Sequence, residues 1–266
     1  MKMLGISSKR RQYLIQLVAQ TKSIIQIDDA VRILNLPRKK AQWLLWSYHK
    51  SGWLKKIKAG TYIPVPQTAT TAKEAIESPL LIATHLFSPG YVGGWTAAHH
   101  WGFTDQLFSK TWFFSEQRII SKEIELENQY FILTHVSRSS LFGLKTIWEN
   151  NHKIIISDPH RTLIDFAHRI DLFGLNAFLD VLKEYLSSEY KNIQTLLDYA
   201  QKIENRTVYK RLGFGTEYLG FDEDELLLTC KQLISKGLSK IAPQLTCPRV
   251  NKRWNLYLPE GLIKHD

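Results

Sequence analysis

The chain has 266 residues, of which 44% are hydrophobic, so it suits one large domain or two smaller ones with an ample core. No apolar run approaches the roughly 20 residues that cross a bilayer, and the N-terminus lacks a signal-peptide core; we expect a cytoplasmic protein without a membrane partner. Cys230 and Cys247 have no metal-ligand spacing and are expected to be reduced thiols.

The net charge of +10 comes from one end of the chain. Residues 1–66 hold 13 Lys and Arg and 2 acidic residues, a net charge of +11, whereas residues 67–266 sum to −1. Such asymmetry indicates a polyanionic partner at one end. Duplex DNA is the expected polyanion, because Lys and Arg that displace its counterions supply the sequence-independent part of affinity. The alternative is a solvated basic face without a partner.

Two short helices are predicted at the start of the chain. Ser7 or Ser8 can cap the first, which opens with Lys9, Arg10 and Arg11. Its apolar stripe consists of Tyr13, Leu14, Leu17 and Val18. The second helix begins within residues 26–30 and continues to Leu34. Each is too short to be stable alone, so both must pack against a third helix.

The stretch from Asn35 to Val65 predicts that third helix and a hairpin. Pro37 suits the first helical position, and Ser51-Gly52 suits a C-terminal stop. Residues 53–57 and 61–65 are strand-like runs around a Lys58-Ala59-Gly60 turn. The apolar face of the helix consists of Ala41, Leu44, Leu45 and Tyr48. A helix, a glycine stop and a basic hairpin follow one another here in the order of a recognition helix and its wing. Residues 1–66 are therefore predicted to be a winged helix-turn-helix domain that binds DNA.

Helix geometry also predicts a reading face. Lys39, Trp43, Trp46 and Lys50 lie opposite the apolar face. Arg reads guanine and Gln reads adenine, so residues near the helix start are best placed for base edges or phosphates. The two tryptophans either flank the phosphate backbone or, as the favoured interpretation, pack onto the wing or the following domain. The predicted DNA-binding residues are Lys9, Arg10, Arg38, Lys39, Lys40, Gln42, Lys50, Lys55, Lys56 and Lys58.

Residues 67–72 contain no large apolar residue, which predicts a linker near residue 70 between domains at 1–66 and 71–266. The second domain is predicted to begin with a helix at 76–87, a glycine-rich turn at 90–95 and a short helix at 96–102. Strand candidates spaced for an antiparallel sheet are 112–114, 119–120, 124–126, 130–133, 147–148 and 153–156.

A helical part follows this sheet. Asp158 and Pro159 are typical of an N-cap and a first helical position, and the stripe of that helix is Leu163, Ile164, Ala167 and Ile170. Four more helices are predicted at 177–186, 193–203, 207–219 and 224–233, and one strand at 251–259. The predicted fold class is therefore α+β: an N-terminal winged helix-turn-helix followed by a larger mixed α/β domain with a helical C-terminal part.

The sequence carries no pattern that specifies catalysis. His99 and His100 point to different helix faces, and of His160, Asp165 and His168 only the last two share a face, whereas a metal needs three or four converging ligands. Residues 90–94 lack the Lys-Ser/Thr of a phosphate-binding loop, and residues 213–215 are too short for a dinucleotide fingerprint. We therefore predict no enzyme, no catalytic residue, no metal and no cofactor.

Four segments resemble the AbiEi family of bacterial antitoxins. Asn35–Val65 resembles the winged-helix module at the start of that family. Residues 91–106, YVGGWTAAHHWGFTDQ, resemble its small-residue helix ending Gly-Leu-Thr-Asp/Glu-Gln, with Phe103 in place of leucine. Asp158-Pro-His-Arg-Thr-Leu-Ile-Asp165 resembles its Pro-x-Arg-Thr-Leu-Leu-Asp helix start, and Arg253-Trp254-Asn255-Leu256 resembles a late Trp-Asn-Leu strand. The four occur in the family's order along nearly the whole chain.

The resemblance implies an AbiE-type toxin–antitoxin system. Such an antitoxin represses its own operon by binding inverted repeats in the promoter, and it counteracts a nucleotidyltransferase toxin without a stable complex. Two other classes stay open. One is a repressor whose larger domain senses a small ligand, and the other is a DNA-acting enzyme with carboxylates such as Asp158 and Asp165 holding metal.

Overall fold

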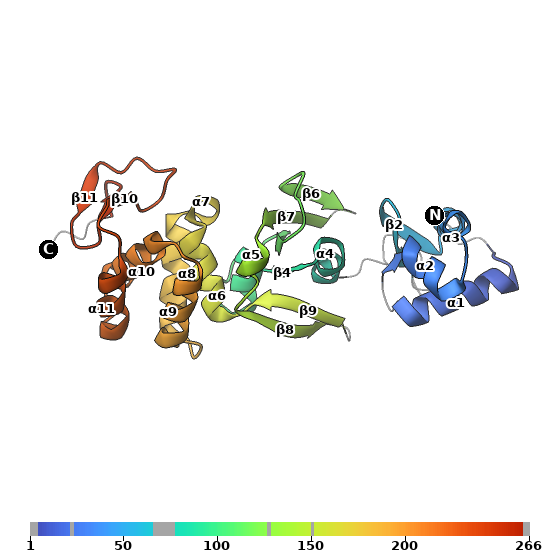
Figure 1. Cartoon of the computed structure of the whole chain (residues 1–266), viewed down its shortest axis with the longest axis horizontal. Coiled ribbons are helices and arrows are strands. Elements are labelled where there is room, and N and C mark those ends of the chain that lie inside the picture. Colours follow the sequence, from blue (N-terminus) through green and yellow to red (C-terminus); the bar gives the residue numbers. More distant parts are fainter. Residues whose placement is uncertain (1–4, 22–23, 66–77, 127–128, 150–151, 263–266) are drawn as a thin grey trace. The chain divides into compact units, whose positions relative to one another are not determined.

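The computed structural model of the protein describes residues 5–21, 24–65, 78–126, 129–149 and 152–262. Two compact units divide the chain: Met1–Ser78 with Leu126–Asn128, and Pro79–Glu125 with Gln129–Asp266. The linker predicted at 67–72 lies outside the described residues. The fold is mixed α/β (Figure 1). None of the helices in the described segments has the length and apolar content that a bilayer crossing requires.

Three helices and a three-stranded sheet build the first unit (Figure 1). The helices are α1 (Ser8–Thr21), α2 (Ile27–Leu34) and α3 (Arg38–Lys50), and the strands are β1 (Ile25–Gln26), β2 (Leu54–Lys58) and β3 (Thr61–Pro64). The predicted face of α3 is buried at Ala41, Leu44, Leu45 and Tyr48, together with Leu14 and Leu17 of α1. These stripes form one core, because none of the three helices can bury its apolar face alone.

The end of α3 follows the predicted glycine stop. Gly52 has φ of +81°, a left-handed conformation that costs glycine little. The Trp53 amide donates to the Tyr48 carbonyl at 2.9 Å and the Gly52 amide to the His49 carbonyl at 3.1 Å, the two bonds of a Schellman motif. The start of α3 differs from the prediction, because Pro37 is the N-cap rather than the first helical residue.

The hairpin after α3, formed by β2 and β3, belongs to a three-stranded sheet in the order β1-β3-β2, so β3 is the central strand. Lys56 pairs with Tyr62 and Lys58 with Thr61, with a register shift between the two pairs. Gly60 has φ of +76°, and its carbonyl accepts the Ile27 amide at 3.2 Å, so the turn rests against the start of α2. The two-residue strand β1, which the sequence pattern does not predict, pairs Ile25 with Tyr62.

A six-stranded sheet lies at the start of the second unit, in the order β6-β7-β5-β4-β9-β8. The predicted antiparallel pairing is confirmed for β8 with β9, but the sheet as a whole is mixed, because β5 runs parallel to β7 and β4 parallel to β9. The strands are β4 (Gly90–Val92), β5 (Lys110–Ser115), β6 (Glu123–Leu126), β7 (Gln129–His135), β8 (Leu144–Glu149) and β9 (His152–Ser157).

Two local predictions in this sheet fail for different reasons. Residues 90–92 form a strand rather than a turn, because Gly90 lets the chain pass β5 where a Cβ atom would lie 2.2 Å from the Phe114 carbonyl oxygen. Residues 119–120 form no strand, and Ile120 is 97% exposed, so an apolar pair alone did not specify one.

The helices of the second unit are α4 (Pro79–Phe87), α5 (Gly94–His100), α6 (Pro159–His168), α7 (Ile170–Phe173), α8 (Leu175–Ser187), α9 (Ile193–Lys202), α10 (Arg206–Leu219) and α11 (Asp224–Leu233), with a 3-10 turn at Arg138–Ser140. Figure 1 shows α6 and the later helices on one side of the sheet, away from α4. The cap of α6 is as predicted, since Asp158 accepts the Arg161 amide at 2.8 Å and Pro159 follows.

The last segment of the described chain folds into a second small sheet, β10 (Ser239–Lys240), β12 (Leu256–Leu258) and β11 (Arg249–Asn251). The single strand predicted at 251–259 is wrong, because a turn at residues 252–255 divides it and β11 pairs antiparallel with β12. Trp254 lies in that turn fully buried, and its Nε1 donates to Glu217 of α10 at 2.5 Å. The turn therefore places the late Trp-Asn-Leu motif against α10.

Candidate nucleic-acid interface

The basic side chains of the first unit gather around the exposed face of α3. Lys39, Lys40, Gln42 and Lys50 are all exposed on this helix, as the helical period predicts. A groove of about 370 Å³ separates α3 from the hairpin. The lining of this hairpin groove includes Lys39, Gln42, Trp43, Trp46, Lys56 and Tyr62. It thus combines two cations, an amide and three aromatic rings in one concave surface.

A second groove, of about 410 Å³, lies between α3 and the beginning of α1. The lining of this α1 groove includes Lys9, Arg10, Tyr13, Lys40 and Trp43. The Tyr48 hydroxyl donates to the Arg10 carbonyl at 2.5 Å and fixes the start of α1 beside α3. Burial raises the pKa of Tyr48, so the hydroxyl stays protonated and keeps this bond. Lys9 and Arg10 therefore extend the basic surface of α3.

Trp43 lines both grooves, and Trp46 lines the hairpin groove. Trp43 is 53% exposed and Trp46 is 47% exposed, and both rings line the hairpin groove together with Lys56 and Tyr62. The Arg10 guanidinium lies 4.8 Å from the Trp43 ring centroid, and the Lys50 ammonium lies 5.8 Å from that of Trp46. These cation–π contacts hold the cations at the surface next to exposed apolar rings.

The two acidic residues within residues 1–66, Asp28 and Asp29, occupy the first turn of α2. Asp28 forms an ion pair with Arg38, and Asp29 one of 3.1 Å with Arg32. Arg38, predicted to read bases, is therefore engaged with a carboxylate. The Arg38 and Asp28 side chains are 65% and 73% exposed, and an ion pair between exposed side chains contributes only about 0–1 kcal/mol to stability. A phosphate or a base edge can replace Asp28 at small cost.

The hairpin lysines do not share one environment. Lys56 is exposed and lines the hairpin groove, whereas Lys55 is only 8% exposed. Successive residues of a strand point to opposite faces, so Lys55 and Lys56 cannot line the same groove. The structure thus removes Lys55 from the predicted set of surface residues. The Lys58 backbone belongs to β2, and its side chain lies outside the described part of the structure.

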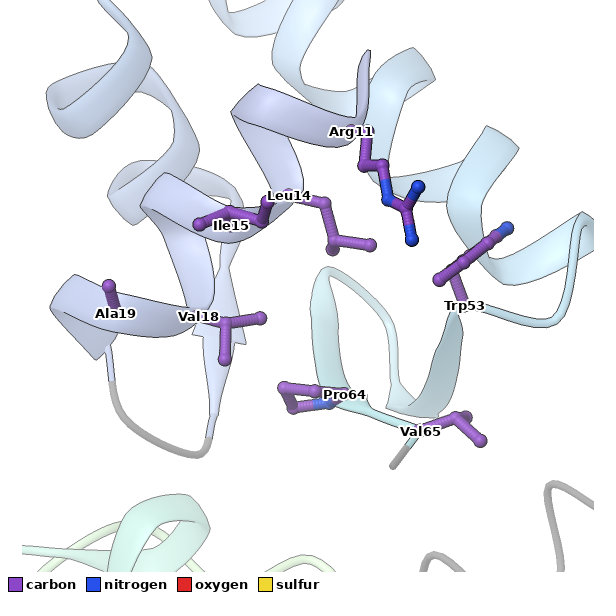
Figure 2. Close-up of a pocket in the computed structure, with 8 residues that line it drawn as sticks. All are labelled: Arg11, Leu14, Ile15, Val18, Ala19, Trp53, Pro64 and Val65. Atoms are coloured by element: carbon purple, nitrogen blue, oxygen red, sulfur yellow. The ribbon is translucent and has the colours of Figure 1, made fainter. Parts of the chain in front are cut away.

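A third groove lies elsewhere on the first unit and is almost entirely apolar. Figure 2 shows Leu14 and Val18 of α1 facing Pro64, with Arg11 and Trp53 at one end of the groove. Ile15, Ala19 and Val65 complete the lining, the volume is about 370 Å³, and Arg11 is its one charged group. Its lining suits an apolar ligand rather than a polyanion.

The motif residues of the second unit meet in a buried network. Arg161 donates from Nε to Asp165 at 2.9 Å and from Nη2 to the Tyr91 hydroxyl at 2.9 Å, and Tyr91 donates to Asp165 at 3.0 Å. Burial raises the pKa of Tyr91 well above its usual range, so the phenol remains a donor. The sequence-based prediction missed this network, although Arg161 and Asp165 are four residues apart on a predicted helix, a spacing that signals an ion pair.

Asp158 and Asp165 do not converge as metal ligands. Asp158 caps α6 and accepts the Tyr199 hydroxyl at 2.9 Å, while both oxygens of Asp165 accept bonds from Arg161 and Tyr91. His168 is paired with Asn205 at 3.2 Å, and burial lowers its pKa to about 4. Across the described segments, no group of three or more metal-ligating side chains converges.

Comparison with known proteins adds no relative to this description. No protein-family model matches the chain, and no curated protein matches it. A functional conclusion therefore depends on the motifs in the sequence and on the two basic grooves around α3. The grooves are suited to a polyanion, because they hold cations from α1, α3 and the hairpin beside hydrogen-bonding and aromatic side chains.

Proposed function

We propose that the first unit is a winged helix-turn-helix domain that binds duplex DNA, with α3 as the recognition helix and β2–β3 as the wing. The observation that carries this proposal is the position of the cations. Lys39 and Lys56 lie in the hairpin groove and Lys9, Arg10 and Lys40 in the α1 groove, so phosphates on both sides of α3 have cationic partners. The net charge of +11 over residues 1–66 supports the same proposal.

The salt dependence of binding tests this proposal. Affinity for a labelled duplex is measured by fluorescence anisotropy over a range of salt concentrations, for the full-length protein and for Lys39→Ala and Lys56→Ala. Each variant removes the cationic partner of one phosphate, so we expect its slope of log affinity against log salt to fall by roughly 0.9. Lys183→Ala, an exposed lysine of α8, is the matched control with an unchanged slope. Unchanged slopes in both groove variants contradict the proposal.

We further propose that the whole chain is an AbiE-type antitoxin that represses its own operon and counteracts a nucleotidyltransferase toxin. The support is the resemblance of four ordered segments to the AbiEi family. Residues of three of these segments, Tyr91, Arg161 with Asp165, and Trp254, are buried in the second unit, as motifs that maintain a shared fold should be. Co-expression with a neighbouring nucleotidyltransferase gene tests this: growth rescue supports it, and continued growth arrest contradicts it.

The apolar groove of Figure 2 favours one alternative, a repressor that responds to a small ligand. Its lining joins α1 to the hairpin through Val18, Trp53 and Pro64, so a ligand there would touch the proposed wing. Operator affinity that changes with an apolar ligand in the wild type but not in Val18→Trp, which fills the groove, would favour this function over the antitoxin.

A further inference from the structure

Trp43 and Trp46 expose 53% and 47% of their surface in the middle of a strongly basic helix face. They are three residues apart and therefore neighbours on the helix, opposite the buried face of α3. Apolar rings left in water are unfavourable, and phosphates or polar base edges offer them no apolar contact. Their position therefore indicates an apolar group on the bound partner.

The surroundings of the rings restrict what that group is. Arg10 and Lys50 already lie over the two rings, at 4.8 and 5.8 Å from the centroids. A stacked base requires an open ring face, whereas a methyl group can touch a ring edge. Trp43 lines both basic grooves, so whatever touches its edge also lies within reach of the phosphate-binding cations.

The major groove of duplex DNA presents one apolar group, the 5-methyl group of thymine. Gln42 lines the hairpin groove beside Trp43, and its side-chain amide can read the adenine of an A·T pair. We propose that Trp43 and Trp46 contact thymine 5-methyl groups in the major groove, so that α3 selects A·T base pairs through apolar contact. This inference rests on the proposed binding of duplex DNA.

The proposal is tested with DNA duplexes in which the base 5-methyl group is removed from thymine or added to cytosine. The full-length protein is titrated against labelled duplexes of about 20 base pairs, one of alternating dA·dT and one with deoxyuridine in place of thymidine. We expect binding to weaken about fourfold for each ring-bound methyl group that the uracil duplex lacks. A second pair, alternating dG·dC with cytosine or with 5-methylcytosine, places a methyl group in the same groove and should bind more tightly when methylated.

The tryptophan variants assign the effect. Trp43→Ala and Trp46→Ala should lose most of the preference for thymine over uracil, measured for each variant as the ratio of its affinities for the thymine and uracil duplexes. Trp43→Phe keeps a ring and should keep part of the preference. Trp148→Ala is the matched control: Trp148 is 64% exposed on β8 with Lys153 5.5 Å from its ring, and the preference should be unchanged.

The possible failures are distinguishable. Equal affinity of the wild type for the thymine and uracil duplexes overturns the inference and leaves duplex binding intact. Absence of binding to any duplex overturns the proposed function with it. Tighter binding to single-stranded oligo(dT), abolished in Trp43→Ala, overturns the inference because the bases would then stack on the rings. Circular dichroism establishes that the variants fold, and Trp43→Phe supplies the test if Trp43→Ala does not.

Discussion

At the scale of single residues, Arg161 illustrates how the second unit accommodates a buried charge. The side chain is 2% exposed, as is its partner Asp165, and the Phe142 ring lies 4.3 Å from the guanidinium. A buried charge is costly unless it is paired and hydrogen-bonded, and Asp165 and Tyr91 supply both. Removing Arg161 would leave the Asp165 carboxylate buried without its counterion.

We therefore predict that Arg161→Ala lowers the free energy of unfolding by about 3–5 kcal/mol, measured by urea denaturation. Lys110→Ala is the control, because its 2.6 Å pair with Glu123 is exposed at 43% and 51% and should contribute at most about 1 kcal/mol. The double variant Arg161→Met/Asp165→Leu should be less destabilised than Arg161→Ala. Similar small losses in Arg161→Ala and Lys110→Ala would show that the network contributes little.

At the scale of elements, α10 holds the C-terminal sheet through a contact that only glycine permits. A Cβ atom on Gly213 would lie 2.1 Å from the Trp254 ring, and Glu217, one turn further on, accepts the Trp254 indole N–H. Arg211 of the same helix donates to the Ile241 carbonyl at 2.8 Å and to the Ala167 carbonyl at 2.7 Å. The glycines at 213 and 215, too short a motif for a dinucleotide site, thus belong to a packing surface.

Gly213→Ala should destabilise the second unit by about 1–3 kcal/mol, even though alanine is the better helix former, because the buried indole must move. Thermal unfolding followed by circular dichroism measures the effect. Gly237→Ala is the matched control, since a Cβ atom there meets nothing within 4 Å, and its midpoint should stay close to wild type. Equal midpoints for the two variants would contradict the assigned role of Gly213.

At the scale of the whole molecule, each unit has its own buried cluster. Leu17, Leu45 and Tyr48 are among the core residues of the first, and Leu163, Phe178 and Trp254 among those of the second. A domain with its own core can fold alone. The net charge of +11 belongs to residues 1–66 and −1 to the remainder, so a duplex is expected to bind the first unit.

We predict that fragments 1–78 and 71–266 each fold and divide the two proposed activities. Cooperative thermal unfolding tests folding, anisotropy tests duplex binding, and co-expression tests growth rescue. Fragment 1–78 should bind duplex DNA without relieving toxicity, and fragment 71–266 should relieve toxicity without binding. A folded 71–266 fragment that fails to rescue growth would show that the proposed antitoxin activity requires both units.

The sequence by itself determined most elements and the charged face of α3. Helical period placed Leu44 in the core and Lys39 in solvent, and the local signals at Gly52 and Asp158 specified a helix end and a helix start. These features are local: each depends on residues within one or two turns of the chain, so pattern and propensity suffice to predict them.

Only the tertiary structure decided which residues share an environment. Strand pairing made the sheet mixed, and strand alternation buried Lys55 beside an exposed Lys56. Packing joined Tyr91 to Arg161, 70 residues apart, and Gly213 to Trp254. The same holds at the candidate site, where Trp43 and Trp46 stay exposed beside Arg10 and Lys50. Such contacts depend on how elements distant in sequence meet, and neither composition nor period along the chain encodes that.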